Sequence, residues 1–258
     1  MIGIFDSGLG GISAFRELRL RRPDLDILYY ADTAHLPYGN KPREKILAYA
    51  RDALARMISL GADSILIACG TVSSVALPTL QESLSIPLYG VITPTARLAY
   101  HISQNKHIGI LATRATIASK AFDAALAQYG YAHTYAIPCP LWVPLVEEGL
   151  FDLHSPLARS AVEHYLSPLA NTNIDTLILG CTHFSHLAPH ITRAHPRISL
   201  VGAGEAAAAD LCSTCPKVGR GESIFYATDA PVSFERMASR LLGAPLQAPV
   251  KHIQSIMK

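Results

Sequence analysis

Two segments of the chain, one in each half, repeat one pattern: a short apolar run, a cysteine, then small or hydroxyl-bearing residues. They read Ser64-Ile-Leu-Ile-Ala-Cys69-Gly-Thr71 and Thr176-Leu-Ile-Leu-Gly-Cys181-Thr-His183. The offset that separates the two cysteines also maps Ile86-Pro-Leu-Tyr-Gly90 onto Ile198-Ser-Leu-Val-Gly202. The repeat therefore predicts a duplicated fold with one cysteine in each half.

Apolar runs typical of buried strands alternate with helical patterns along the chain. The runs span residues 2–5, 27–31, 65–68 and 88–92, and they restart at 108–112, 176–179 and 199–201, while residues 46–58 show helical periodicity. Such alternation predicts an α/β fold with parallel sheets covered by helices. Each cysteine then lies where a strand passes into a helix, which is where α/β proteins place their sites.

The length of 258 residues exceeds that of a usual single domain. We expect two similar parallel-sheet domains related by a pseudo-two-fold axis, with the active site in the cleft between them. The first comprises residues 1–97 and 207–258, and the second comprises residues 98–206. The segment from about residue 206 has no counterpart in the first half. It is predicted to form a helix, a strand at 223–226 and a helix at 232–242, which return to the first domain.

Two equivalent thiols facing one cleft suit a two-base racemase. One thiolate removes a proton from a stereocentre, and the opposed thiol delivers a proton to the other face. A thiol pKa near 8.5 leaves both protonation states accessible, and a helix N-terminus lowers it further. The alternative for any one cysteine is packing in the core, because cysteine is often buried. Two cysteines at matched positions favour the catalytic interpretation.

Composition narrows the class of protein. Half of the residues are hydrophobic, 16% are charged and the net charge is +2, so the chain can bury a core and carries no extended basic field. The cluster of basic side chains from Arg16 to Arg22 is interpreted as a solvated helix face, with nucleic-acid binding as the alternative. No apolar stretch is long enough to span a bilayer and no secretory signal precedes the first strand, so we expect a cytoplasmic protein that does not bind membranes.

The five cysteines, an odd number, fit free thiols better than disulfides. Cys212 and Cys215 form a CxxC pair that suggests zinc or redox chemistry. Because no second CxxC or histidine pair stands at ligand spacing, we expect no metal.

A glycine-rich turn, Asp6-Ser7-Gly8-Leu9-Gly10-Gly11, follows the first predicted strand. Nucleotide binding is one interpretation, but Ser13 stands where GxGxxG needs its third glycine and a carboxylate would repel a phosphate. Asp6 is better placed to meet a substrate ammonium or to steer a thiol's proton. The alternative is a helix N-cap.

Three further segments carry candidate residues. His183 lies two residues after Cys181 and is close enough to relay that thiol's proton. Glu147, in Pro144-Leu-Val-Glu147-Glu148-Gly149, could orient His183 or simply end a helix. The loop of residues 32–39 combines turn formers with Tyr38, and the alternative interpretation is an ordinary connection.

Taken together and in order, these motifs resemble bacterial glutamate racemases of the aspartate/glutamate racemase superfamily. The resemblance runs from the N-terminus to about residue 206. It implies a cofactor-independent enzyme that interconverts L- and D-glutamate and supplies D-glutamate for peptidoglycan. It also implies two similar α/β domains with the active site between them.

Carried over by position, the resemblance makes Cys69 and Cys181 the acid/base thiols. Asp6 and His183 assist proton transfer and contact substrate, and Glu147 lies behind His183. The remaining substrate-contacting positions are Ser7, Tyr38, Gly39, Gly70, Thr71 and Thr182. We expect glutamate as the small-molecule substrate, no cofactor, no nucleic-acid partner and a homodimer.

The chain departs from the family pattern at two places. Cys69-Gly70-Thr71 stands where the family reads Cys-Asn-Thr, and Gly202-Ala203 stands where it usually has Asp-Ser. A lost amide hydrogen bond to a charged group costs about 1.5–3 kcal/mol. Gly70 therefore marks either a weakened glutamate site or an altered one. The alternatives are a racemase or decarboxylase for aspartate or another acid, and a weakly active racemase-fold protein with a binding role.

Overall fold

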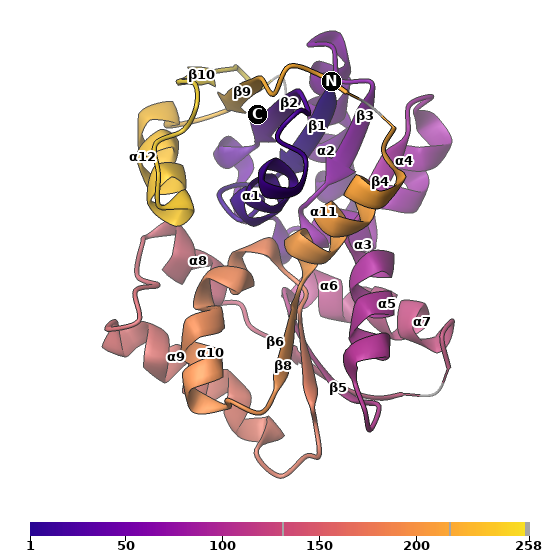
Figure 1. Ribbon diagram of the computed structural model, residues 1–258, viewed down its shortest axis with the longest axis vertical. Coiled ribbons are helices and arrows are strands. Elements are labelled where there is room, and N and C mark those ends of the chain that lie inside the picture. The colour runs from indigo at the N-terminus through magenta and orange to yellow at the C-terminus, as the bar shows by residue number, and fades with distance from the viewer. Residues whose placement is uncertain (131, 217, 256–258) are drawn as a thin grey trace.

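The computed structural model describes residues 1–130, 132–216 and 218–255. Two parallel sheets form the framework, one in the upper half of the view in Figure 1 and one in the lower half. The first sheet contains β1 (Ile2–Asp6), β2 (Ile27–Ala31), β3 (Ser64–Ile67), β4 (Leu88–Gly90), β9 (Ser223–Ala227) and β10 (Val250–His252). The second contains β5 (His107–Ala112), β6 (His133–Pro138), β7 (Thr176–Leu179) and β8 (Ser199–Gly202). The predicted α/β class with parallel sheets is confirmed.

The two sheets share a strand order. The first contains β2-β1-β3-β4 and the second is β6-β5-β7-β8. Their registers also match, because Ile65 pairs with Leu88 and Leu177 pairs with Leu200, and both members of the second pair are shifted by the offset that separates the cysteines. The repeat seen in the sequence is therefore a repeat of strand order and of hydrogen-bond register.

The C-terminal segment enlarges only the first sheet. β9 pairs with β2 and β10 pairs with β9, so β2 has a neighbour on its outer side whereas the equivalent β6 is an edge strand. The predicted strand and helix of this segment are confirmed. Strands β6 and β10 were not predicted, because both are edge strands with exposed or half-buried residues, and β6 ends on a proline.

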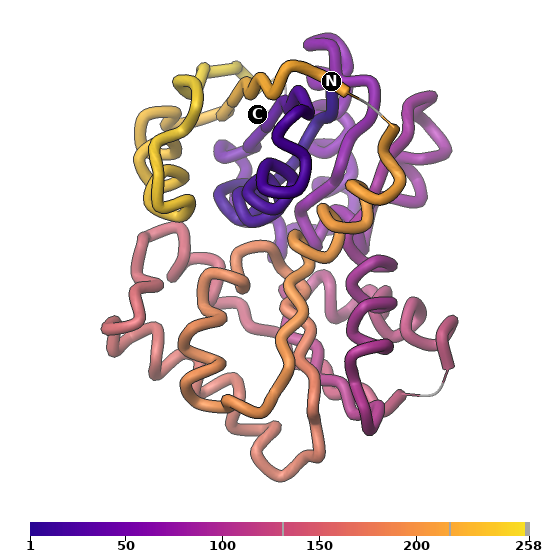
Figure 2. The backbone as a smooth tube through the Cα atoms, viewed as in Figure 1, coloured from indigo at the N-terminus to yellow at the C-terminus, as the bar shows by residue number. Residues whose placement is uncertain are grey.

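Helices cover the sheets and also join them. Helix α5 (Ile92–Ile102) lies against β7 and β8, and α11 (Ala203–Thr214) packs on both α1 (Ile12–Arg21) and α5. Figure 2 shows the chain passing from the upper half to the lower through α5 and returning through α11. The expected domain boundaries after residues 97 and 206 fall inside these two helices, and they stay a prediction. The helices are α1 (Ile12–Arg21), α2 (Arg43–Ser59), α3 (Gly70–Val75), α4 (Leu77–Ser83), α5 (Ile92–Ile102), α6 (Arg114–Ser119), α7 (Ala121–Ala127), α8 (Trp142–Glu147), α9 (Pro156–Leu166), α10 (Ala188–Ala194), α11 (Ala203–Thr214) and α12 (Pro231–Leu242).

The element after Cys181 differs from the expected α-helix. It is a 3₁₀ helix, η4 (Thr182–Leu187), and α10 begins only at Ala188. Proline explains the break, because an α-helix starting at Thr182 would place Pro189 in its interior. Pro189 would then lack a hydrogen-bond donor and would clash with the carbonyl of Ser185. The remaining 3₁₀ helices are η1 (Thr33–His35), η2 (Tyr38–Asn40) and η3 (Ser167–Leu169).

The hydrophobic core runs from one half into the other. One buried cluster contains Ile4 of β1, Ile178 of β7 and Ala207 of α11. The halves therefore share packing behind the cleft. Among the helices in the described part of the chain, none combines the length and apolarity needed to cross a bilayer.

Candidate active site

The carboxyl ends of β3 and β7 bring the two predicted thiols to one cavity. Cys69 ends the first repeat segment and Cys181 the second, and both side chains are buried. The cavity between the halves is lined by both cysteines together with Ser7, Tyr38, Gly39, Thr71, Thr182 and His183. The duplication thus places one thiol from each half at the same site, as predicted.

Cys181 belongs to a chain of three interacting side chains. Its Sγ lies 3.7 Å from His183 Nδ1, and His183 Nε2 lies 2.5 Å from Glu147 Oε1. Burial alone would lower the pKa of His183, but its hydrogen bonds with Cys181 and Glu147 outweigh burial and raise the pKa well above its usual value. The imidazolium is therefore placed to donate a hydrogen bond to Cys181 when the sulfur carries negative charge.

Glu147 fulfils both interpretations of its motif. It is the last residue of α8, and its carboxylate also orients His183. The same oxygen, Oε1, accepts the backbone N–H of Leu9 at 3.0 Å. A carboxylate from the second half therefore also holds the glycine-rich turn of the first.

Asp6, the last residue of β1, is completely buried and is not among the residues that line the cavity. Its carboxylate accepts hydrogen bonds from Gly8 N–H at 2.9 Å and from the Thr182 hydroxyl at 3.0 Å. Burial raises the pKa of Asp6, and the charge of His183 partly opposes that rise. The N-cap alternative is not what the structure shows, because α1 is capped at Gly11 without a side-chain hydrogen bond.

Cys69 has a different environment from Cys181. Its sulfur lies 3.6 Å from the Ser7 hydroxyl. Burial, followed by the charge of Asp6, raises the pKa of the Cys69 thiol to about 12. The expected lowering by a helix N-terminus is outweighed, because α3 is short and the thiol is desolvated. Cys69 therefore holds its proton at neutral pH.

Comparisons with known proteins agree with this geometry. The family model for Asp/Glu/Hydantoin racemase matches residues 18–211. The chain is 40% identical to the glutamate racemase of Persephonella marina over 246 residues, covering 95% of this chain and 94% of that protein. The chain belongs to the glutamate racemase family.

Solved glutamate racemases share the whole fold. An isoform from Bacillus anthracis superimposes with a TM-score of 0.92 at 30% identity, covering 100% of this chain and 98% of that chain. The Francisella tularensis glutamate racemase, solved in complex with D-glutamate, gives 0.89 at 30% identity with the same coverages. An aspartate racemase from Picrophilus torridus, at 20% identity and a TM-score of 0.60, shares the fold alone.

Glycines of the first half sit where the two halves of this family member touch. A Cβ at Gly10 would lie 2.3 Å from Thr182 Oγ1 and 2.7 Å from the His183 backbone nitrogen. A Cβ at Gly70 would lie 2.2 Å from the Gly180 carbonyl oxygen. The glycine-rich turn therefore serves close approach between the halves, which accounts for its failure to match a nucleotide-binding pattern.

The closed cleft is small. Its cavity measures about 20 Å³, which is room for about one water molecule. Glutamate is larger than this space, so its binding requires the residues that line the cavity to move apart. Gly10 and Gly70 allow the segments around the two thiols to pack closely against each other.

Thr113 and Arg114 are among the lining residues that were missed in the sequence. The Thr113 hydroxyl lies 2.9 Å from that of Thr71, which joins the two halves across the site. Arg114 adds a cation at the rim. Both follow β5, so the rule that parallel strands carry sites at their carboxyl ends would have found them.

The CxxC pair stays outside this chemistry. Cys212 and Cys215 are free thiols near the end of α11. In the described residues, no three His, Cys, Asp or Glu side chains are grouped so that they could hold a metal ion.

The buried Cys69 thiol predicts a loss of stability at alkaline pH. Its folded-state pKa of about 12 lies above the ordinary thiol value of 9.0. The contribution of this protonated thiol to the free energy of unfolding is therefore complete below pH 9 and is lost as the pH rises toward 12. Between pH 9 and pH 11, wild type should lose about 2 kcal/mol more unfolding free energy than Cys69→Ser. Urea titrations of both proteins at the two pH values measure this difference, and parallel losses would contradict the raised pKa.

Proposed function

We propose that this chain interconverts L- and D-glutamate by a two-base mechanism in which Cys69 and Cys181 are the bases. The observation that carries the proposal is the meeting of the two thiols, one from each half, in a single cavity. Family membership supplies the reaction class, and the opposed thiols supply a route for inversion at Cα.

We propose that the reaction begins with Cys69 protonated and Cys181 as the base. Cys69 retains its proton because it is buried near Asp6, while Cys181 faces the cationic His183. From this state the Cys181 thiolate removes the Cα proton, and the electron pair of the C–H bond passes into the substrate as a carbanion. The Cys69 thiol then gives its proton to the opposite face of Cα. Racemisation in the other direction exchanges the two roles.

Asp6 and Thr182 support this exchange from below the cleft. Their hydrogen bond joins the floor of the first half to the residue after Cys181. We propose that Asp6 meets the substrate ammonium on closure, with Thr182, Ser7, Thr71 and the segment of Tyr38 and Gly39 as further contacts. A bound ammonium beside Asp6 would offset the cost of burying that carboxylate.

The second class of function, decarboxylation of a related acid, needs a proton at only one face. Two thiols on one cavity therefore favour racemisation. Two alternatives remain: racemisation of aspartate, and a binding role with weak activity. Both predict a lower racemisation rate with glutamate than the main proposal does.

We expect purified protein to convert L-glutamate into D-glutamate until the two enantiomers are equal. Full activity should survive dialysis against EDTA and treatment with hydroxylamine, because the proposed acid and base groups belong to the chain. Chiral chromatography measures the product, with aspartate as the comparison substrate. No D-glutamate, or faster racemisation of aspartate, would refute the glutamate assignment, and activity that returns only with added cofactor would refute cofactor independence.

By family analogy, the product would serve peptidoglycan synthesis in the cytoplasm, and the protein would act as a homodimer. The dimer is tested by sedimentation equilibrium across a range of concentrations. A monomer at micromolar concentration would contradict it.

A further inference from the structure

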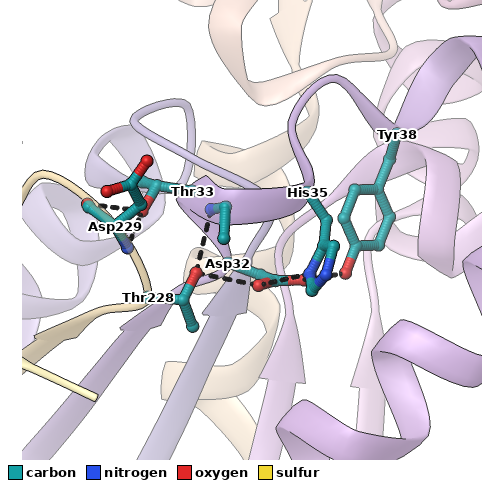
Figure 3. A network of polar contacts seen from close by, with 7 residues as sticks. Asp32, Thr33, His35, Tyr38, Thr228 and Asp229 are labelled. Atoms are coloured by element: carbon teal, nitrogen blue, oxygen red, sulfur yellow. Dashed lines mark hydrogen bonds and ion pairs between the residues drawn. The ribbon is translucent and has the colours of Figure 1, made fainter. Parts of the chain in front are cut away.

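The loop between β2 and α2, residues 32–42, carries Tyr38 and Gly39 into the cleft but contains only two short 3₁₀ turns. Its position depends on a buried carboxylate, Asp32. This carboxylate accepts a hydrogen bond from the Tyr38 hydroxyl, and one of its oxygens lies 2.8 Å from His35 Nδ1 (Figure 3). Because the Tyr38 hydroxyl is directed to Asp32, the side chain anchors the loop.

A third donor to Asp32 comes from the far end of the sequence. The Thr228 hydroxyl donates to Asp32 Oδ1 at 2.9 Å and accepts the backbone N–H of Ala34, also at 2.9 Å. Figure 3 shows this hydroxyl between the carboxylate and the loop backbone. Thr228 is 5% exposed, so water has little access to replace these bonds.

A second pair of hydrogen bonds, between Thr33 and Asp229, lies beside the two bonds of the Thr228 hydroxyl. Thr33 Oγ1 donates to the Asp229 carbonyl at 2.7 Å and accepts the Asp229 N–H at 2.8 Å. The contacts follow from sheet register, since Ala31 of β2 is paired with Ala227 of β9. The next residues of both strands therefore lie side by side at the carboxyl edge.

We propose that Thr228 is a positioning residue for the racemase reaction, holding the substrate loop through Asp32 and Tyr38. This inference rests on the proposed function. It gives the C-terminal segment a role beyond completing the sheet. Among the described strands, β9 is added outside β2, and no strand is added outside the equivalent β6. Thr228 acts through the loop and not on the reacting atoms, so its loss should weaken substrate binding more than the proton transfer.

The test is Thr228→Val, which keeps the side-chain shape and leaves Asp32 and Ala34 without this partner. We expect KM for both enantiomers of glutamate to rise about 10-fold while kcat changes less than about 3-fold. Thr228→Ser keeps the hydroxyl and should restore KM. The matched control is Thr134→Val on β6, away from the loop. This change removes a threonine hydroxyl that donates a hydrogen bond to Asp123 of α7 at 2.7 Å. Its KM should equal that of wild type.

Hydrogen exchange supplies a readout independent of activity. The peptide containing Ala34 should exchange faster in Thr228→Val than in wild type or Thr134→Val. An unchanged KM in Thr228→Val, whether or not exchange increases, would overturn the positioning role. If Thr228→Val does not fold, Thr33→Val removes the adjoining bonds and must raise KM for the proposal to stand. A wild-type protein without racemase activity would instead overturn the proposed function and the positioning role with it, while exchange would still report the loop contact.

Discussion

Replacing either thiol by alanine should abolish racemisation, with kcat falling at least about 1,000-fold for Cys69→Ala and for Cys181→Ala. In a two-base mechanism each enantiomer needs one sulfur as its base and the other as its acid. Removing one sulfur takes the base from one enantiomer and the acid from the other. Racemisation is therefore lost in both directions, and polarimetry from either enantiomer measures the loss.

The two variants should differ in the partial reaction that they retain. Cys69→Ala keeps the Cys181–His183–Glu147 chain and should still exchange the Cα proton of one enantiomer with deuterated solvent. Cys181→Ala should retain exchange of the other enantiomer, at a lower rate because the Cys69 pKa is about 12. Cys139→Ala is the control, since it removes a buried thiol that does not line the cavity. Near-native racemisation by either site variant, or exchange of the same enantiomer by both, would contradict the opposed-thiol model.

The framework of this fold could be predicted because its signals are local and repeated. Apolar runs located most of the strands, and a constant offset between the two halves exposed the duplication before any contact was known. The site followed from the same rule, since Cys69 and Cys181 end equivalent strands. Edge strand β6 escaped prediction because an edge position relaxes the need for a continuous apolar run.

Features that depend on contact between distant segments could not be predicted. The sequence offers no sign that the Thr228 hydroxyl meets Asp32, because that contact requires β9 to pair with β2. The pKa of Cys69 was also misjudged, since the pattern revealed the helix N-terminus and not the degree of burial. The local sequence pattern identified the candidate catalytic side chains, whereas packing in the folded protein determines that Cys69 is protonated.

Gly70 is another residue whose role depends on contact between distant segments. It leads to the second prediction with a large expected effect. From the sequence, the missing family asparagine left two interpretations of Gly70 open, a weakened glutamate site or an altered one. The structure favours an adapted site, because any Cβ at residue 70 would lie 2.2 Å from the backbone oxygen of Gly180. Backbone atoms cannot rotate away as a side chain can. Accommodation would require a shift of about 1 Å between the segments that carry the two thiols, since non-bonded heavy atoms need more than 3 Å of separation.

We therefore expect Gly70→Asn and Gly70→Ala to lower kcat for glutamate about 100-fold, since a displacement of about 1 Å in a reacting geometry has that effect. Gly90→Ala is the matched control, because its Cβ would crowd only the flexible end of Leu77, with Ser73 at ordinary contact distance, and Gly90 does not line the cleft. Steady-state kinetics on glutamate and aspartate compare the three variants with wild type. A loss shared by Gly90→Ala would indicate general destabilisation. A gain with glutamate in Gly70→Asn would mean that the halves can separate at low cost and that the amide is the missing contact, so the contact between Gly70 and Gly180 would not set the spacing of the thiols.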